Sequence, residues 1–358
     1  MENTADYTGY SYEYEDGGDD NGNMCDFSEW EPTYSLIPIL YMLIFILGLS
    51  GNGVVILTVW RSKSKRRAAD VYIGNLALAD LTFVVTLPLW AVYTALGYHW
   101  PFGAALCKIS SYVVLVNMYA SVFCLTCLSF DRYLAIVHSL SGGRLRSRGT
   151  MLTSLAAIWA LSGLLAVPTL LFRSTVHDEL NNRTACAMDF GLVAPSPQQE
   201  WLWIAGLSLS SSILGFLLPF LAMTIFYCFI GSTVTRHFNT VRKEDQKKRR
   251  LLKIITTLVV VFAICWTPFH VLKSLDALSY LDLAPSSCSV LSFLLLAHPY
   301  ATCLGYLNSC LNPFLYAFFD LRFRSQCLCL LSLKKAVHGQ ISSLSSQKCE
   351  AQSLATKV

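Results

Sequence analysis

The sequence predicts an all-α membrane protein, a bundle of seven transmembrane helices. Three observations lead to this prediction: the composition, seven long apolar stretches and a one-sided distribution of basic residues. Of the 358 residues, 54% are hydrophobic and only 14% are charged, whereas about a quarter of an average soluble domain is charged. Because a soluble protein of this size needs a charged surface, the composition argues against an ordinary soluble enzyme. It also argues against disorder over most of the chain.

The first segment, residues 1–35, is acidic. It contains ten carboxylates and no Lys or Arg, which is typical of a disordered arm. A cleaved signal peptide begins basic and then turns apolar, so this start does not resemble one. We therefore expect an acidic, disordered arm ahead of a helical bundle over residues 36–319.

The bundle is predicted from seven apolar stretches. Each reaches or exceeds the roughly 20 helical residues that cross about 30 Å of hydrocarbon. Helices satisfy every backbone polar group in lipid, and the stretches are too long and continuous for barrel strands. The stretches cover residues 36–60, 71–96, 109–137, 151–172, 201–235, 254–278 and 290–319.

The basic residues predict the orientation. Of 27 Lys and Arg residues, 23 lie in the first, third and fifth loops, at the end of the third span or in the C-terminal tail. The positive-inside rule makes that side cytoplasmic, so an odd number of spans gives an extracellular N-terminus and a cytoplasmic C-terminus. Topology explains these basic loops without a nucleic-acid partner.

After the seventh span, residues 320–331 show an apolar residue every four positions with arginines between them. This pattern predicts a short amphipathic helix on the membrane surface. Within it, Cys327 and Cys329 are candidate palmitoylation sites because of their juxtamembrane position. Residues 332–358 are expected to form a disordered cytoplasmic tail.

Four cysteines lie on the predicted outer side: Cys25, Cys107, Cys186 and Cys288. An even count in an oxidising compartment suggests two disulfides, and four cysteines allow three pairings. Our first choice joins Cys107 to Cys186, which leaves Cys25 for Cys288. The glycosylation sequon at Asn182 also falls outside, where it could be used.

Asp80 is an ionisable residue in the middle of a span, where its cost of several kcal/mol makes it a functional candidate. Asn117 and Ser121 are four residues apart and share a helical face, and Asn308 and Asn312 repeat that spacing on the seventh span. Together these residues predict either a small hydrated cation site around Asp80 or a water-filled hydrogen-bond network that specifies packing.

Two further features suggest a conformational change. Asp131 and Arg132 end the third span at the cytoplasmic face, where they form either a breakable lock or an ordinary interfacial pair. Pro268 follows Trp266, and Pro313 lies in the seventh span; each removes a backbone hydrogen bond and can kink its helix, although kinks also occur for packing alone.

Other classes of membrane protein fit less well. The sequence contains no P-loop, HExxH or GxSxG motif and no clustered metal ligands, so we do not expect an enzyme. Transporters often have repeated halves and interrupted helices, but this chain has no repeat between its halves.

Seven motifs in register resemble those of the rhodopsin-like (class A) G protein-coupled receptors, over roughly residues 30–330. Within this class the chain looks like the peptide-receptor branch that contains the chemokine, angiotensin and apelin receptors, and the second outer disulfide pattern supports that branch. Residues 79–90, 100–103 and 116–126 most resemble apelin receptors. The motifs are Gly51-Asn52-Gly53-Val54, the block ending at Asp80, Asp131-Arg132-Tyr133, Trp159, Pro219 with Tyr227, Cys265-Trp266-Thr267-Pro268 and Asn312-Pro313-x-x-Tyr316.

The resemblance implies a plasma-membrane receptor that a basic peptide such as apelin or Elabela (Toddler) activates. It implies signalling through inhibitory (Gi/o) G proteins, with arrestin, a receptor kinase and membrane lipids as further partners. No cofactor is implied except an allosteric sodium ion at Asp80. Another basic peptide or a chemokine is the alternative ligand. The implied activation residues are Asp131, Arg132, Tyr133, Tyr227, Trp266, Pro268, Pro313 and Tyr316.

An acidic outer face should attract a cationic peptide. Within the arm, Asp26, Glu29 and Trp30 resemble the acidic and aromatic cluster of apelin receptors. Gly97 and His99 stand in the first outer loop where the resemblance leads us to expect carboxylates. The candidate ligand-binding residues are Asp26, Glu29, Trp30, Trp90, Tyr93, Arg173, Asp189, Lys273 and Tyr300.

Overall fold

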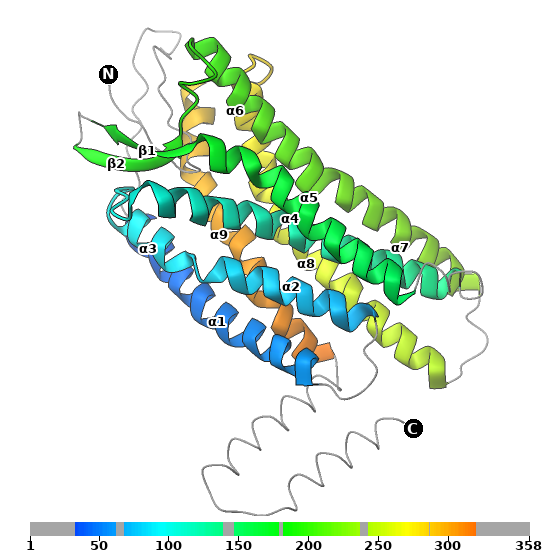
Figure 1. Cartoon of the computed structure of the whole chain (residues 1–358). Helices are drawn as coiled ribbons and strands as arrows, with labels where there is room; N and C mark the ends of the chain where they lie inside the picture. Colours follow the sequence, from blue (N-terminus) through cyan, green and yellow to red (C-terminus); the bar gives the residue numbers. More distant parts are fainter. Residues whose placement is uncertain are drawn as a thin grey trace, which may run out of the picture.

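The computed structural model confirms seven helices that are long and apolar enough to cross a membrane, packed side by side in one bundle (Figure 1). The predicted surface helix at 320–331, the tail, and the arm up to residue 32 lie outside the described part of the chain. The described residues are 33–61, 68–138, 147–178, 182–236, 243–285 and 287–319.

Each span begins before the apolar stretch that predicted it, because the first helix of the span continues beyond the hydrocarbon. The first, third, fourth, sixth and seventh spans are single helices, whereas the second and fifth are divided. The elements are α1 (Thr33–Arg61), α2 (Ala68–Val84), α3 (Leu87–Ala95), α4 (Gly103–Ile136), α5 (Arg148–Phe172), α6 (Pro197–Ser212), the π-helix η1 (Ile213–Leu217), α7 (Leu218–Arg236), α8 (Lys243–Ser279) and α9 (Cys288–Phe319).

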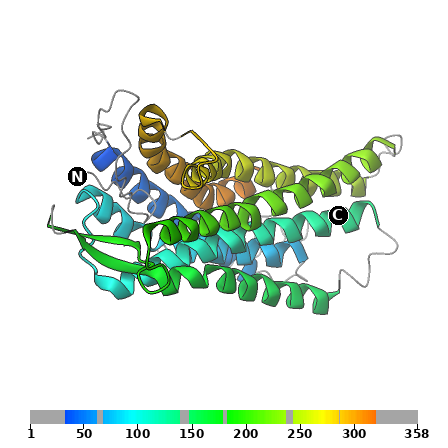
Figure 2. The same ribbon diagram turned by 90° about the horizontal axis from the view of Figure 1, so that it is seen from above.

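Helix α4 is the centre of the bundle. It packs against α2, α5, α7 and α8, while α9 packs against α1 and α8, an arrangement that Figure 2 shows from a second direction. The largest core cluster includes Leu76, Leu125, Phe262 and Trp266, all buried. Because lipid is as apolar as these side chains, close packing and interhelical hydrogen bonds hold the helices together.

Prolines accompany both divided spans. Pro88 lies in the first turn of α3, a position that tolerates its missing N–H, and the helix breaks just before it. Pro219 follows η1, whose wider turn brings Gly215 against α4. A Cβ atom at Gly215 would lie 2.9 Å from Cε of Met118 and 3.1 Å from Cε1 of Tyr119, so glycine allows α4 to approach closely here. The proline pattern predicted kinks but gave no sign of a π-helix.

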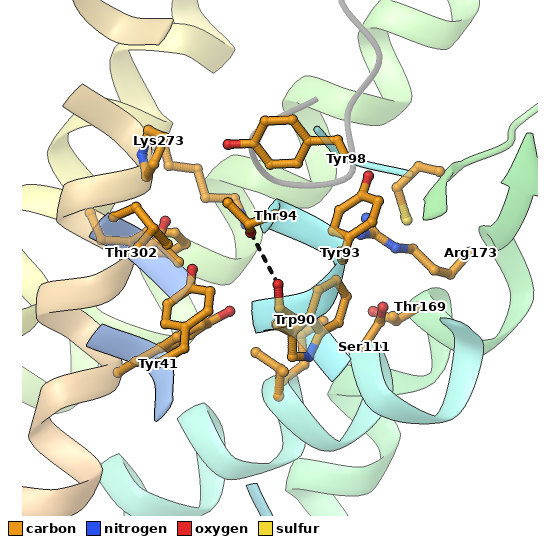
Figure 3. A pocket seen from close by; sticks show the side chains of 17 residues that line it. Tyr41, Trp90, Tyr93, Thr94, Tyr98, Ser111, Thr169, Arg173, Lys273 and Thr302 are labelled. Atoms are coloured by element: carbon orange, nitrogen blue, oxygen red, sulfur yellow. Dashed lines mark hydrogen bonds between the residues drawn. The ribbon is translucent and has the colours of Figure 1, made fainter. Parts of the chain in front are cut away.

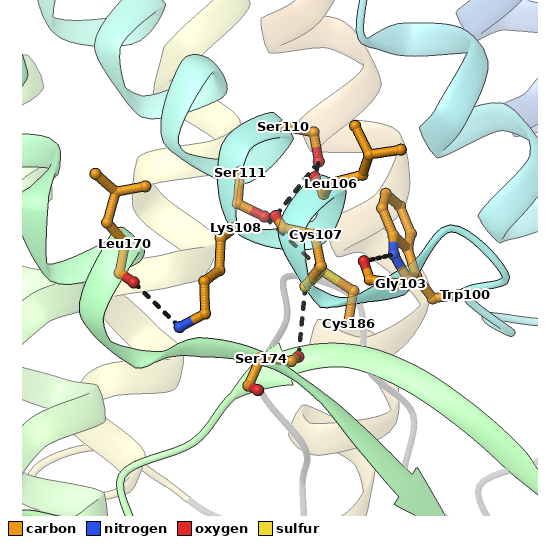
Figure 4. The surroundings of a disulfide bond; sticks show 10 residues. All are labelled: Trp100, Gly103, Leu106, Cys107, Lys108, Ser110, Ser111, Leu170, Ser174 and Cys186. Carbon is orange, nitrogen blue, oxygen red and sulfur yellow. Dashed lines mark hydrogen bonds between the residues drawn. A yellow bond between two sulfur atoms is a disulfide. The ribbon is translucent and has the colours of Figure 1, made fainter.

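A β-hairpin covers one end of the bundle, and the sequence pattern did not predict it. Strand β1 (Arg173–Asp178) pairs antiparallel with β2 (Arg183–Met188), with Arg173 opposite Met188. The Cys107–Cys186 disulfide ties β2 to the start of α4 across 5.7 Å between Cα atoms (Figure 4), which confirms our first choice of pairing. Cys288 is also disulfide-bonded, whereas Cys25 lies outside the described residues.

Candidate functional site

A cavity of about 970 Å³, including its open mouth, lies beneath the hairpin. Helices α1, α3, α4, α8 and α9 and the hairpin all contribute to its wall (Figure 3). Four of the predicted ligand residues line it: Trp90, Tyr93, Arg173 and Lys273. A concave site with a few polar groups among apolar side chains is the usual form of a ligand site.

The cavity is cationic. Arg173 and Lys273 stand on opposite sides of it in Figure 3, and only 5% and 9% of their respective surfaces are exposed. The guanidinium carbon of Arg173 is 5.9 Å from the ring centre of Trp90, and Nζ of Lys273 is 5.6 Å from that of Phe269, which are cation–π distances. No Asp or Glu is among the described residues that line the cavity, so it favours an anionic group.

Hydroxyl groups make up much of the remaining wall, and of these the sequence analysis predicted only Tyr93. Thr302 and Tyr306 lie one helical turn apart on α9 and line the cavity together, and this spacing of four is the signal that could have revealed them. In an apolar span, such residues are easily taken for packing residues. The hydroxyl-bearing residues of the wall are Tyr41, Tyr93, Thr94, Tyr98, Ser111, Thr169, Thr302 and Tyr306.

Two other predicted ligand residues do not line this cavity. The Tyr300 hydroxyl lies 3.2 Å from Oγ1 of Thr33 and so links the start of α1 to α9. Asp189 is exposed, and its Oδ1 accepts a hydrogen bond of 3.0 Å from the Gly191 backbone N–H. The acidic and aromatic cluster of the arm (Asp26, Glu29 and Trp30) lies outside the described residues.

Trp266 lies one layer below the cavity. Its ring is 5.6 Å from that of Phe269, which lines the cavity wall. On its other side, Gly305 of α9 approaches so closely that a Cβ there would lie 3.0 Å from the indole. Trp266 therefore connects the cavity to both α8 and α9, within one turn of Pro268.

A buried network surrounds Asp80, whose side chain is fully buried. Asn117 and Ser121 donate to Oδ1 at 3.0 and 3.3 Å, and Asn312 donates to Oδ2 at 2.9 Å. These bonds join α2, α4 and α9. All three donors are neutral, and a buried carboxylate surrounded by neutral donors is a fitting place for a small cation.

The structure differs from the predicted network at one residue. Asn308 is buried, but it makes no hydrogen bond to Asp80 within the described residues, and its Oδ1 has no hydrogen-bond partner there. Its neighbour Ser309 takes part instead, since its hydroxyl donates to Oδ1 of Asn117 at 3.4 Å. The prediction relied on a spacing of four from Asn312, but a spacing of three also keeps two residues on one helical face.

At the opposite end of the bundle, Asp131 and Arg132 form an ion pair and both are buried. The adjacent Tyr133 stacks on Phe226 of α7 at 5.4 Å, and its hydroxyl lies 3.0 Å from Nε2 of His138. Both charges of this pair have lost their hydration, so each depends on the other for a partner.

The remaining predicted residues are placed as follows. Tyr227 packs against the main core cluster, and Pro313 lies within α9, where it contacts Gly51 of α1. Asn182 is exposed in the turn between the two strands. The side chain of Tyr316 and the whole of Cys327 and Cys329 are outside the description.

Comparison with known proteins agrees with this architecture. Residues 51–316 match the family described as "7 transmembrane receptor (rhodopsin family)". The chain therefore belongs to the rhodopsin family of seven-transmembrane receptors. Such a chain is a multi-pass membrane receptor and not an enzyme.

Within this family the chain is similar to apelin receptors over its whole length. It is 81% identical to apelin receptor A of Danio rerio over the full length of both chains. It is 62% identical to the apelin receptor of Xenopus tropicalis over 97% of each chain. The type-1 angiotensin II receptor of Bos taurus is 41% identical over 83% of this chain and 81% of that receptor.

Proposed function

We propose that this chain is a cell-surface receptor for apelin and related basic peptides, including Elabela, and that it signals through inhibitory (Gi/o) G proteins. The observation that carries this proposal is the full-length similarity to receptors named for apelin. The cationic cavity under the hairpin supports a peptide ligand with an anionic group at its inserted end.

The two ends of such a peptide would meet opposite charges. The acidic arm, with Asp26, Glu29 and Trp30, attracts the basic body of the peptide and raises its local concentration. Inside the cavity, Arg173 and Lys273 bind the terminal carboxylate through charge-assisted hydrogen bonds. This arrangement fixes the direction in which the peptide enters.

The proposed activation is a population shift, in which the peptide and the G protein each favour the same open state. The peptide displaces Phe269, which in turn displaces Trp266, and the kink at Pro268 lets α8 move. The Asp80 network then rearranges; a sodium ion bound there would be held by the Asp80 carboxylate in the closed state. Arg132 separates from Asp131 and contacts the G protein, with Tyr133, Tyr227, Pro313 and Tyr316 supporting the open state.

Other proposed partners act on the cytoplasmic side, which the basic loops assign to the face that carries Arg132. A receptor kinase would phosphorylate serines of the tail, and the added charge would recruit arrestin. Palmitate on Cys327 or Cys329 would hold the surface helix on the membrane lipids, and Asn182 would carry a glycan on the outer face.

The experiment is to express the chain in cells and measure inhibition of cyclic AMP by apelin, Elabela, angiotensin II and a chemokine panel. Angiotensin II belongs in the panel because of the 41% identity to its type-1 receptor. We expect a response to apelin that pertussis toxin abolishes. No response to apelin at micromolar doses, with surface expression confirmed, would contradict the proposal.

A further inference from the structure

His99 connects the first outer loop to the hairpin. Its ring Nδ1 accepts a hydrogen bond of 3.1 Å from the backbone N–H of Thr184 in β2. The next residue, Trp100, donates its own backbone N–H to the Thr184 carbonyl at 2.7 Å. Both the backbone N–H and the backbone carbonyl of Thr184, on the free edge of β2, are therefore hydrogen-bonded. The acceptor for the N–H is an imidazole.

This contact helps to anchor β2. Another anchor is the Cys107–Cys186 disulfide, two residues further along the strand. The disulfide fastens the middle of the strand, whereas His99 holds the part nearest the turn. Because Arg173 and Met188 pair at the far end of the hairpin and both line the cavity, the hold on β2 positions the cavity wall.

A row of aromatic rings leads from His99 to Arg173, the cation that is proposed to bind the ligand. Trp100 is almost fully buried and lies 5.2 Å from the ring of Trp90. Arg173 in turn lies over Trp90. Displacing the loop around His99 would therefore move the surface on which the Arg173 guanidinium rests.

We propose that His99 is a positioning residue for the ligand cavity and that its hold on the hairpin depends on pH. The ligand part of this inference rests on the proposed function. The geometry requires an unprotonated Nδ1, because an imidazolium has two N–H donors and no acceptor. Imidazole is the side chain that changes protonation between pH 5 and 8, so acid removes the contact with Thr184.

Charged groups near this contact come from the loop and from both strands. Arg183 donates from Nη1 to the Gly97 carbonyl at 3.0 Å, which holds its guanidinium against the loop that carries His99. Nδ1 of His177 also lies near this strand, 3.3 Å from Oγ1 of Thr184. Within the described parts of these elements, the other charged or titratable residues are Arg173, Asp178, which is the register partner of Arg183, and Tyr98.

The sign of the effect follows. The docked hairpin binds the neutral form of His99, so its stability is fully present above the imidazole range and is lost as the pH falls through it. Ligand held at neutral pH would then leave faster in an acidic compartment. Loss of one such hydrogen bond corresponds to roughly a threefold to tenfold change in the equilibrium between the docked and the released hairpin.

The test compares the full-length receptor with His99→Asn and His99→Phe, in lipid nanodiscs and without ligand. The Asn carbonyl can accept the Thr184 bond but does not titrate, whereas Phe cannot accept it. Amide hydrogen exchange of the peptide containing Thr184 is measured at pH 5.5 and 7.4. Variants are compared at the same pH, so that the chemical exchange rate cancels.

We expect equal protection of wild type and His99→Asn at pH 7.4 but threefold to tenfold lower protection of wild type at pH 5.5. His99→Phe should be poorly protected at both values. His177→Asn is the matched control on the hairpin and should keep the wild-type pH dependence. The proposal is overturned if His99→Asn loses protection in acid as wild type does, or if His177→Asn alone abolishes the effect.

Dissociation of fluorescent apelin provides the second readout. It should be faster at pH 5.5 than at 7.4 for wild type but nearly independent of pH for His99→Asn. If apelin does not bind, the proposed function fails while the exchange result still decides the role of His99. If apelin binds and both receptors release it equally in acid, His99 does not position the ligand site.

Discussion

Nδ2 of Asn312 lies 2.9 Å from Oδ2 of Asp80, joining the seventh span to the second at the level of the bundle core. The bond connects two helices that are 232 positions apart in sequence at this point. It places a buried carboxylate against Asn312, the sequence neighbour of Pro313, which is one of two prolines inside α9. A change in the charge at Asp80 therefore acts directly on α9 through Asn312.

The first prediction concerns sodium. In wild-type receptor we expect sodium to lower agonist affinity, because the ion would stabilise the inactive Asp80 network. Asp80→Asn removes the negative charge while retaining the size of the side chain, so the sodium effect should disappear. Agonist competition binding in sodium chloride and in a matched salt with a large organic cation measures this. A sodium response that persists in Asp80→Asn would exclude the site.

The second prediction separates the two asparagines of α9. Asn312→Ala removes a donor to Asp80. The sodium concentration for half-effect should rise by about tenfold, since hydrogen bonds to charged groups contribute roughly 1.5–3 kcal/mol. Asn308→Ala removes no bond to Asp80 and should leave the sodium concentration for half-effect close to wild type. The same sodium titration of both variants provides the comparison. Equal losses would mean that Asn308 also contacts the ion.

Much of the fold follows from the sequence, because seven apolar stretches in lipid can only become helices. The hairpin was not predicted, since its strands are short and half polar and depend on the disulfide at Cys186. The π-helix was missed because its cause is tertiary: Gly215 is the place where α4 approaches. For similar reasons the spacing of polar residues located the Asp80 network but chose Asn308 over Ser309.

The cavity was partly predictable. Arg173 and Lys273 are cations at the outer ends of spans, which marked them for function. Tyr41 and Tyr306 come from α1 and α9, and their common cavity depends on how those helices pack, which no local pattern records. Tyr300 shows the converse: it was a reasonable aromatic candidate, but in the structure it contacts Thr33.

The third prediction concerns the hairpin disulfide. Cys107→Ser combined with Cys186→Ser should lower thermal stability and peptide affinity, because removal of a native disulfide typically costs about 2–5 kcal/mol and releases β2 from α4. Thermal unfolding of the purified receptor and peptide binding are the measurements. Cys228→Ser, at an exposed free cysteine, is the control. Unchanged peptide affinity in the double variant would show that the hairpin does not shape the site.

The fourth prediction addresses the ion pair next to Tyr133. Asp131→Asn removes the partner of Arg132 while preserving the shape of the side chain, so Arg132 is freed for a G protein. Basal signalling without ligand should rise several-fold. Nucleotide exchange on purified inhibitory G protein reports it at equal receptor density. Basal exchange at or below wild type would argue that the pair is structural and does not restrain the receptor.

The central claim is that a basic peptide inserts an anionic end between Arg173 and Lys273, and equilibrium binding of two apelin peptides tests it most directly. One peptide has a free C-terminal carboxylate and the other an amide, and each is bound to purified wild type and Arg173→Gln. Our account predicts that wild type prefers the free acid by about tenfold or more. This preference should largely vanish in Arg173→Gln. Equal affinity of wild type for acid and amide would contradict the account.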